Sequence, residues 1–385
     1  MHHPASRRTL LLGTLCLGLR PSFAQDNDSR IATAVDRAIR SLMLRHDVPG
    51  MAVGVTAGGE RHVFHYGVAS RENGSPVLPG TLFEIGSLSK PFTATLAAYA
   101  QALGKLSLDD APGSILRELR GTPIDAASLL HLGTYTAGGL PLQFPDAVTE
   151  LREAVAFYRA WKPKARPGEQ RRYSNPSIGL LGHLTELAMQ REFGELAQAE
   201  LFRPLGLDRT FIRVPARHAQ DYAWGYDKAN RPVRVNPGVF DAQAYGVKTT
   251  VGDMLGFLEA HIDASALAPA LRRAVAQTQV PRFQVGPMVQ GLGWEQYPFP
   301  VALERLQAGN ASTMALEPHP AQELAASVPR EPTLFNKTGS TNGFGAYAAF
   351  VPSRRIGVVL LANRNVPVPA RIDAAHAVLL EAMRI

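Results

Sequence analysis

Apolar residues recur at helical spacing near the start of the chain. Between positions 28 and 45 they lie three or four residues apart, which predicts an amphipathic helix over Asp28 to Arg45. Pro49-Gly50 interrupts this pattern. Two strand-like runs follow, Met51 to Thr56 and His62 to Val68, and Gly58-Gly59 between them predicts a hairpin. The apolar helix positions are Ile31, Val35, Ala38, Ile39 and Leu42.

The C-terminal end repeats this arrangement in reverse. Ala346 to Val351 and Ile356 to Leu361 predict two strands, and a last helix carries an apolar stripe. Because the strands lie at both ends and helical patterns fill the middle, we expect an α/β (α+β) fold, a mixed sheet with antiparallel strands flanked by helices. Residues 25–82 and 285–385 would form this α/β domain, and residues 83–284 an inserted helical domain. The active site is expected at the domain interface. The stripe consists of Ile372, Ala375, Leu379 and Met383.

Residues 1–24 have the features of a cleaved export signal. Arg7 and Arg8 form a basic start, and Leu10 to Leu19 is an apolar run too short to span a bilayer. Ser22-Phe23-Ala24 offers a signal-peptidase site, and residues 6–11 also fit a twin-arginine signal. The sequence therefore predicts a periplasmic protein, exported by the Sec or the twin-arginine route, without a stable membrane anchor.

Removal of this segment changes the composition of the chain. It takes away Cys16, which we interpret as an apolar filler, so the mature chain has no thiol and no disulfide. It also takes away three arginines and no acids, so the net charge falls from +7 to +4. This mild charge, without a stripe of arginines and aromatics, argues against a nucleic-acid partner.

The first chemical motif is Ser87-Leu88-Ser89-Lys90, a serine three residues before a lysine. The pattern predicts a helix running from about Ser87 to Leu103. Residues three apart share a helix face, so Lys90 is expected to point where Ser87 points and to lower the pKa of the serine hydroxyl. The alternative is a helix cap at Ser87 and an exposed charge at Lys90.

The second motif, Tyr173-Ser174-Asn175-Pro176, reads as a turn after the basic loop from Lys162 to Arg172. A tyrosine held near two lysines favours its phenolate, which can accept the proton of Ser87 and later that of water. Asn175 is expected to hydrogen-bond the Lys90 amine and a substrate amide. The alternative is a loop tyrosine with its ring on the core.

The third motif is Lys337-Thr338-Gly339-Ser340, just before the C-terminal strands. As an edge strand it can pair its backbone with an extended substrate amide, and its lysine can attract a carboxylate. The amide N–H groups of Ser87 and Ser340 are candidates for an oxyanion hole. Gly339 and Gly343 would keep the approach open. The alternative is a surface turn with a solvated lysine.

The order serine, tyrosine, lysine is similar to that of the serine β-lactamase and penicillin-binding protein superfamily. Longer strings resemble the class C β-lactamases, the AmpC-type cephalosporinases, and cover nearly the whole mature chain. These strings are Leu129 to Gln143, Ala244 to Thr250, Gln290 to Glu295, Asn336 to Phe350, and Leu361 to Asn365 followed by Pro369-Ala370-Arg371.

This resemblance implies a serine β-lactamase that prefers cephalosporins, a monomer with small-molecule substrates and no cofactor. It implies Ser87 as the nucleophile, with Lys90, Tyr173 and Lys337 as the proton-handling group. The implied substrate-binding residues are Gln143 and Asn175 at the substrate amide, Tyr245 as a pocket wall, and Thr338, Ser340, Asn365 and Arg371 at the carboxylate end. Many members carry asparagine three positions before this arginine; Val368 stands there instead and cannot donate a hydrogen bond.

Three other functions share parts of this pattern. A D,D-peptidase or penicillin-binding protein has the same motifs with slow deacylation. A superfamily esterase is disfavoured because Lys337-Thr338-Gly339 is intact. A non-catalytic cell-wall binding protein would not need all three motifs.

The sequence argues against metal and nucleotide chemistry. His62 and His65 are three apart on a predicted strand, so they face opposite sides, and we find no metal-ligand cluster elsewhere. No glycine-rich phosphate loop follows a predicted strand. Ser87 is not in a G-x-S-x-G string, which argues against an α/β-hydrolase.

Overall fold

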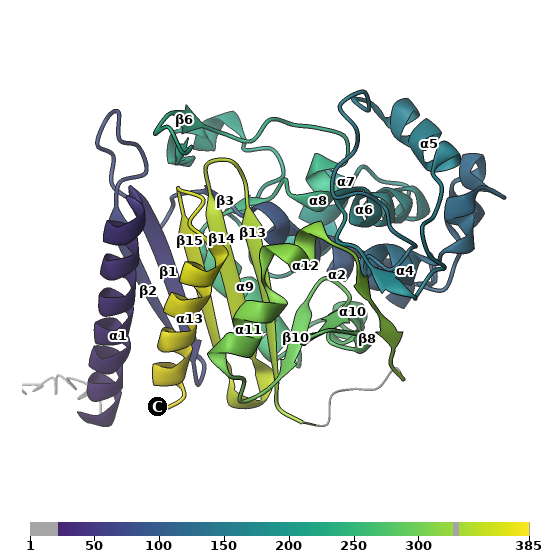
Figure 1. Ribbon diagram of the computed structural model, residues 1–385. Coiled ribbons are helices and arrows are strands. Elements are labelled where there is room, and N and C mark those ends of the chain that lie inside the picture. Colours follow the sequence, from purple (N-terminus) through teal and green to yellow (C-terminus); the bar gives the residue numbers. More distant parts are fainter. Residues whose placement is uncertain (1–21, 326–330, 385) are drawn as a thin grey trace, which may run out of the picture.

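The computed structural model describes residues 22–325 and 331–384 (Figure 1). The predicted signal segment therefore lies outside the described residues, with Cys16, except for its last three positions. Those positions belong to helix α1 (Ser22–His46), which begins before the predicted start at Asp28. The apolar stripe marks the buried face only from Ile31 on, so it could not locate the first turns. Within the described ranges, no helix has both the length and the apolar character needed to cross a membrane.

One antiparallel sheet is built from both ends of the chain, as predicted. The N-terminal hairpin is β1 (Gly50–Ala57) and β2 (Glu60–Gly67), and the C-terminal strands are β14 (Gly345–Val351) and β15 (Ile356–Ala362). β15 lies between β14 and β1, with Met51 opposite Ala362. This pairing closes the sheet between segments some 300 residues apart in the sequence.

Five further strands extend the sheet away from the termini. They precede β14 in the spatial order β12-β8-β9-β10-β13-β14-β15-β1-β2, and every neighbouring pair is antiparallel. The strand that carries the third motif, β13, is therefore central. The added strands are β8 (Pro281–Val285), β9 (Met288–Gly291), β10 (Glu295–Pro298), β12 (Gln322–Glu323) and β13 (Thr333–Ser340).

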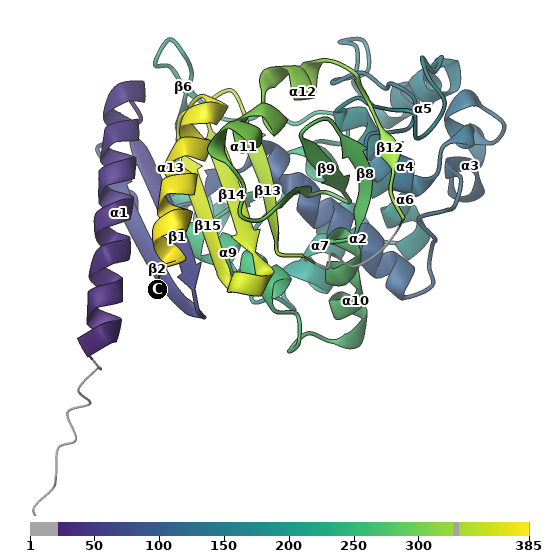
Figure 2. The ribbon, with the colours of Figure 1, turned by 60° about the horizontal axis from the view of Figure 1, so that its bottom comes forward.

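Helices cover both faces of this sheet. On one face, Met51, Val53 and Val55 join a buried cluster with α1 and the last helix, α13 (Val368–Ala382). Figure 2 shows α1, α13 and α11 (Leu303–Gly309) in front of the strands. On the other face lies α9 (Val251–Ile262), so close that a side chain at Gly54 would meet Leu255 at 2.7 Å. The alternating strand pattern thus supplies two separate cores.

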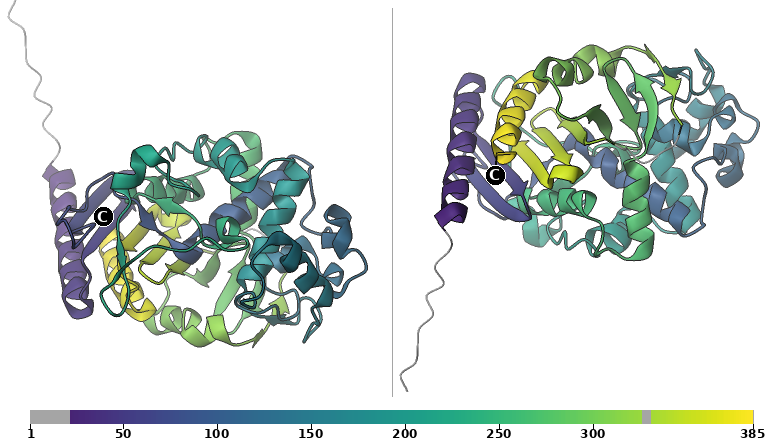
Figure 3. Two further views of the ribbon diagram at one scale, coloured as in Figure 1. Left: turned by 90° about the horizontal axis from the view of Figure 1, so that it is seen from above. Right: turned by 90° about the horizontal axis from the view of Figure 1, so that it is seen from below.

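A helical part lies beside the sheet, as the views from above and below show (Figure 3). Its core is a third apolar cluster around α2 (Lys90–Ala102) and α6 (Asn175–Met189). A short ladder between β4 (Gln170–Arg171) and β11 (His319–Pro320) ties it to the chain that leads into β13. The remaining helices here include α3 (Pro112–Ile115), α4 (Leu129–Gly133), α5 (Leu151–Ala160), α7 (Phe193–Ala197), α8 (Asp241–Ala244) and α10 (Pro269–Thr278).

Candidate active site

The three motifs meet at a cavity of about 500 Å³ between the sheet and the helical part. Its lining includes Ser87, Tyr173 and Lys337, together with Asn310 and Val368. Two larger cavities, of about 790 and 650 Å³, lie elsewhere and contain none of the three motif side chains Ser87, Tyr173 and Lys337. The chemistry of the lining, not its size, therefore identifies the candidate site.

Ser87 lies in a single 3₁₀ turn, Gly86–Ser89, that leads directly into α2. Lys90 is the first residue of α2, and its side chain is fully buried. Its ammonium donates hydrogen bonds of 2.8 Å to Ser87 Oγ and 2.8 Å to the Ala244 carbonyl. Burial lowers the pKa of Lys90 to about 8, so near neutral pH an appreciable share of this amine can accept a proton. The alternative of an exposed charge at Lys90 is wrong.

Tyr173 lies where the two lysines converge. The ammonium groups of Lys90 and Lys337 are each 5.0 Å from the centre of its ring. Burial alone would raise the pKa of Tyr173, but the charges of Lys337 and Lys90, with close polar contacts to Ser87 and Lys90, outweigh it and lower the pKa to about 8. The neighbouring Ser174 caps α6 by accepting a hydrogen bond of 3.0 Å from the Ser177 amide, which fixes the turn.

Lys337 lies on β13 with 2% of its surface exposed, so it is not a solvated turn residue. β10 pairs with β13 only over Thr333 to Asn336, whereas β14 pairs with the strand as far as Ser340. The expected edge strand is thus a central strand. In its second half, Lys337 to Ser340, one edge has no strand partner among residues 22–325 and 331–384. That half lines the cavity and can still accept a substrate backbone.

Two glycines bring Ser87 and Ser340 together. Gly86 has a positive φ of 50°, and a side chain there would meet the Ser340 backbone at 2.5 Å. A side chain at Gly339 would meet the Ile85 carbonyl at 1.9 Å. The 3₁₀ turn and β13 therefore touch backbone to backbone beside the nucleophile. Gly343, expected to open the same approach, instead packs on Gly225 and Val233, away from the cavity lining.

Gln143 and Asn175 form a pair. The Asn175 amide donates a hydrogen bond of 2.9 Å to Gln143 Oε1, and its own Oδ1 is buried with no partner among the described residues. The expected bond from Asn175 to Lys90 is replaced by the bond from Lys90 to Ala244, because α8 brings that carbonyl to the ammonium. Tyr245, directly after α8, is half-buried and is not among the residues lining the 500 Å³ cavity.

Arg371 is not free to bind a substrate directly. Its guanidinium is 1% exposed and donates to the Gly339 carbonyl at 2.5 Å and to Ser340 Oγ at 2.9 Å. It also donates to the Ala346 carbonyl at 2.9 Å and to Asn365 Oδ1 at 3.3 Å. Asn365 is exposed and lines the neighbouring 650 Å³ cavity, whereas the half-buried Val368 lines the cavity of Ser87.

The sequence interpretation missed a buried ion pair beneath Tyr173. Arg171 and Glu295 are 2% and 5% exposed, and their charged groups lie 3.5 Å apart. Glu295 also lies 3.6 Å from the Lys337 ammonium. Arg171 is two residues from Tyr173, but it lies near the end of a basic loop. Nothing in the sequence of that loop distinguishes a buried arginine from a solvated one. In the sequence, Glu295 was notable only as the last residue of Gln290 to Glu295, one of the strings that resemble the class C β-lactamases.

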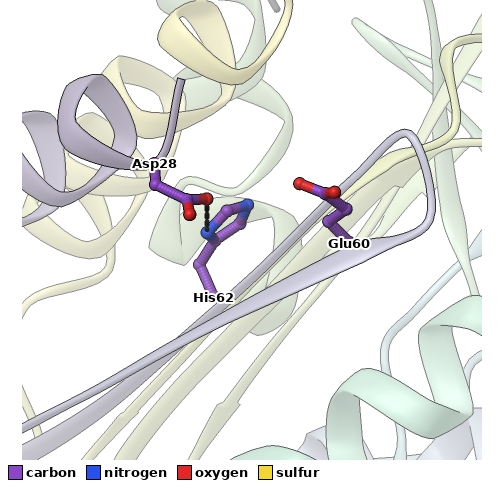
Figure 4. Close-up of side chains that lie close together, drawn as sticks. All are labelled: Asp28, Glu60 and His62. Atoms are coloured by element: carbon purple, nitrogen blue, oxygen red, sulfur yellow. Dashed lines mark ion pairs between the residues drawn. The ribbon is translucent and has the colours of Figure 1, made fainter. Parts of the chain in front are cut away.

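The structure also corrects the expectation that metal-ligand residues do not cluster. Asp28 on α1 and Glu60 and His62 on β2 place one ligand atom each within 4.8 Å of one another (Figure 4). Glu60 and His62 share a strand face because they are two residues apart, but the approach of α1 was not visible in the sequence. His62 Nδ1 already lies 3.3 Å from Asp28 Oδ1. This cluster is at the edge strand β2, four strands from β13 in the sheet order.

Comparisons with known proteins all point to one family. A family model described as beta-lactamase matches residues 35–383. A beta-lactamase of Pseudomonas fluorescens is 48% identical over 91% of this chain and 98% of its own. A class C beta-lactamase solved in complex with cefoxitin is 40% identical with a TM-score of 0.89, covering 92% of this chain and 99% of that one. A D-alanine carboxypeptidase AmpC from Burkholderia cenocepacia is 46% identical with a TM-score of 0.86, over 92% and 99%.

The match of the family model over nearly the whole described chain, the relative at 48% identity and the fold shared with class C structures lead to one conclusion. This chain belongs to the beta-lactamase family of hydrolases, in its class C group.

Proposed function

We propose that this protein hydrolyses the lactam amide of β-lactam antibiotics, cephalosporins preferred, through a Ser87 acyl-enzyme. The observation that carries the proposal is the hydrogen bond of 2.8 Å between the buried Lys90 ammonium and Ser87 Oγ, with Tyr173 beside both. A serine is a weak nucleophile unless an adjacent base takes its proton. Both neighbouring groups have a pKa of about 8, and the charge of each favours the ionised form of the other.

Acylation follows from these positions. The Ser87 hydroxyl gives its proton to the Lys90–Tyr173 pair while Oγ forms a bond to the lactam carbonyl carbon. The backbone N–H groups of Ser87 and Ser340 stabilise the resulting oxyanion. The carbon–nitrogen bond then breaks, and the ring nitrogen takes a proton from Tyr173. Lys337 attracts the substrate carboxylate and favours the ionised tyrosine.

Deacylation uses the same groups in reverse order. A water molecule gives its proton to Tyr173 and attacks the ester carbon, and Ser87 leaves with a proton returned from the pair. The product is the ring-opened acid. Gln143 and Asn175 hold the substrate amide, and Tyr245, which lies outside the lining of the 500 Å³ cavity, is a wall only for a substrate that extends beyond that cavity. Thr338, Ser340, Asn365 and Arg371 form or support the carboxylate end.

We further propose that the enzyme is periplasmic, acts as a monomer and has no stable membrane anchor. The export and the lack of an anchor rest on the composition of residues 1–24, and the monomeric state is what the resemblance to class C β-lactamases implies. N-terminal sequencing of the exported protein tests it. A start at Gln25 supports cleavage after Ala24, and an uncleaved N-terminus contradicts it.

A D,D-peptidase activity is the second candidate, because one relative of 46% identity is titled a D-alanine carboxypeptidase. Purified protein should be given a chromogenic cephalosporin and, in parallel, an N-acyl-D-alanyl-D-alanine peptide. Fast turnover of the cephalosporin supports the lactamase. A single stoichiometric burst of cephalosporin opening, together with cleavage of the peptide, supports the peptidase. No reaction with either substrate points to an esterase or a binding protein.

The nucleophile itself is tested by Ser87→Ala. Turnover should fall by several powers of ten because no acyl-enzyme can form. Ser114→Ala, at an exposed serine of α3, is the matched control and should keep full activity. Mass spectrometry of the wild type with a slow substrate should find the adduct on the Ser87 peptide. An adduct elsewhere, or an active Ser87→Ala protein, contradicts the assignment.

A further inference from the structure

We infer that Glu295 is a positioning residue of this site. It holds the Lys337 ammonium beside Tyr173 and, paired with Arg171, balances the charge around the phenol. The catalytic meaning of this inference depends on the proposed function. The contacts of Glu295 from which it is argued do not depend on that function.

Glu295 is fixed by the sheet between two cations. On β10 it lies opposite Asn336, the residue directly before Lys337, and on the other side opposite Gln290 of β9. Its carboxylate is 3.6 Å from Lys337 Nζ and 3.5 Å from Arg171. A carboxylate that is 5% exposed is retained only when it is paired, because an isolated buried charge is costly.

Arg171 is held just as firmly on the other side. Its guanidinium donates hydrogen bonds of 2.7 Å to Gln290 Oε1 and 2.6 Å to the Met314 carbonyl. These anchors keep its centre 5.5 Å from the Tyr173 ring and 5.4 Å from the Tyr135 ring. Arg171 therefore cannot turn away when its carboxylate partner is removed.

The groups facing Tyr173 come from several elements, and their charges are unequal. Three cations surround its ring, each from a different element, and Glu295 is the carboxylate placed among them. The neutral neighbours are Ser87 and Tyr135. The ring of Tyr135 lies 4.8 Å from that of Tyr173, and burial raises the pKa of Tyr135. The cations are Lys90 on α2, Arg171 on β4 and Lys337 on β13.

The consequence of removing Glu295 has a definite sign. Three uncompensated cations favour the phenolate more strongly, so Tyr173 should ionise at lower pH. Loss of Arg171 together with Glu295 removes one charge of each sign and should restore the balance. A contact that only stabilised the fold would not produce this opposite pair of effects.

The direct test is the titration of Tyr173 in the protein without substrate, followed by NMR of ¹³Cζ-labelled tyrosine and assigned with Tyr173→Phe. Glu295→Gln should lower the midpoint by about one pH unit. The double variant Glu295→Gln/Arg171→Gln should return it to within a few tenths of a unit of the wild type. The acid limb of kcat/KM should move in the same sense. Glu304→Gln, an exposed acid on α11, is the control and should change neither.

An unchanged midpoint in folded Glu295→Gln overturns the inference, as does a double variant shifted as far as the single one. Glu295→Asp keeps the charge but withdraws it from Lys337, so it tests the holding role even where Glu295→Gln does not fold. It should raise KM for a carboxylate-bearing lactam about threefold to tenfold, with the Tyr173 midpoint retained. An unchanged KM contradicts the holding role. Since the NMR titration needs no substrate, failure of lactam hydrolysis would leave this inference testable.

Discussion

Arg371 donates a hydrogen bond of 2.9 Å to the hydroxyl of Ser340, the residue whose amide lies beside the nucleophile turn. The same guanidinium donates to the carbonyls of Gly339 and Ala346, on β13 and β14. Arg371 thus joins the last helix, α13, to the end of β13. In this position the guanidinium can hold the end of β13, where we propose that a substrate carboxylate binds, rather than contact the substrate itself.

This position predicts the outcome of Arg371→Ala. Removing the buried guanidinium leaves the buried Gly339 and Ala346 carbonyls without this donor, a loss of about 1–3 kcal/mol each, whereas the hydroxyl of the exposed Ser340 can turn to water. We expect a clearly lower unfolding temperature together with a fall in kcat. The measurements are thermal unfolding and steady-state kinetics. A fully stable variant with only a raised KM would show that Arg371 binds substrate directly.

Val368→Asn tests the neighbouring position on the same helix. The side chain lines the cavity and is half-buried, so an asparagine there can offer a hydrogen bond to a bound carboxylate. One such bond contributes about 0.5–1.5 kcal/mol, so KM should change about tenfold or less with kcat nearly unchanged. Val368→Leu, which matches asparagine in size but offers no hydrogen-bond donor, is the control. A collapse of kcat in the asparagine variant would show that this position shapes the reacting geometry.

His261 should make the fold sensitive to acid. It is buried on α9 among Phe257, Trp294 and Phe350, and its ring Nδ1 lies 2.9 Å from the Phe257 carbonyl. Burial lowers its pKa to about 4, below the value of about 6.5 in an unfolded chain. Between these values the unfolded chain binds a proton that the folded protein does not. Stability therefore falls as the pH drops from about 6.5 to 4, by at most on the order of 3 kcal/mol from this residue.

The test compares urea unfolding of wild type and His261→Phe at pH 7 and pH 4.5. The variant should lose less stability between the two pH values than the wild type does. His319→Gln, at a half-exposed histidine, should lose as much as the wild type. Equal losses in wild type and His261→Phe would exclude His261 as a source of acid sensitivity.

Metal removal should leave catalysis unchanged. Among the described residues, the ligand cluster Asp28, Glu60 and His62 lies four strands from β13, roughly 19 Å across the sheet. Turnover of a chromogenic cephalosporin should be the same with and without EDTA. Activity that disappears in the chelator and returns with zinc would overturn the serine mechanism.

The sequence by itself determined most of the sheet built from the two termini and the identity of the motif residues. Short strand-like runs bounded by turn residues located β1, β2, β14 and β15 to within one or two residues, because β1, β14 and β15 are buried over their whole length and read as continuous apolar runs. The serine–lysine spacing likewise predicts a shared direction, since residues three apart on a helical turn are neighbours. These are local properties, and local spacing is what a sequence records.

Only the tertiary structure decided which charges are buried and what they contact. Arg171 and Glu295 come from β4 and β10, about 120 residues apart, and nothing in either segment distinguishes a buried ion pair from two solvated charges. Within the described chain, the edge at Lys337 to Ser340 lacks a strand partner because β10 stops pairing at Asn336, which depends on the partner strand. The sequence left open whether Arg371 binds a substrate or docks the last helix, and only the folded chain brings Gly339, Ala346 and Ser340 around its guanidinium. Burial and partner choice are properties of the whole packing, so no single segment of the chain encodes them.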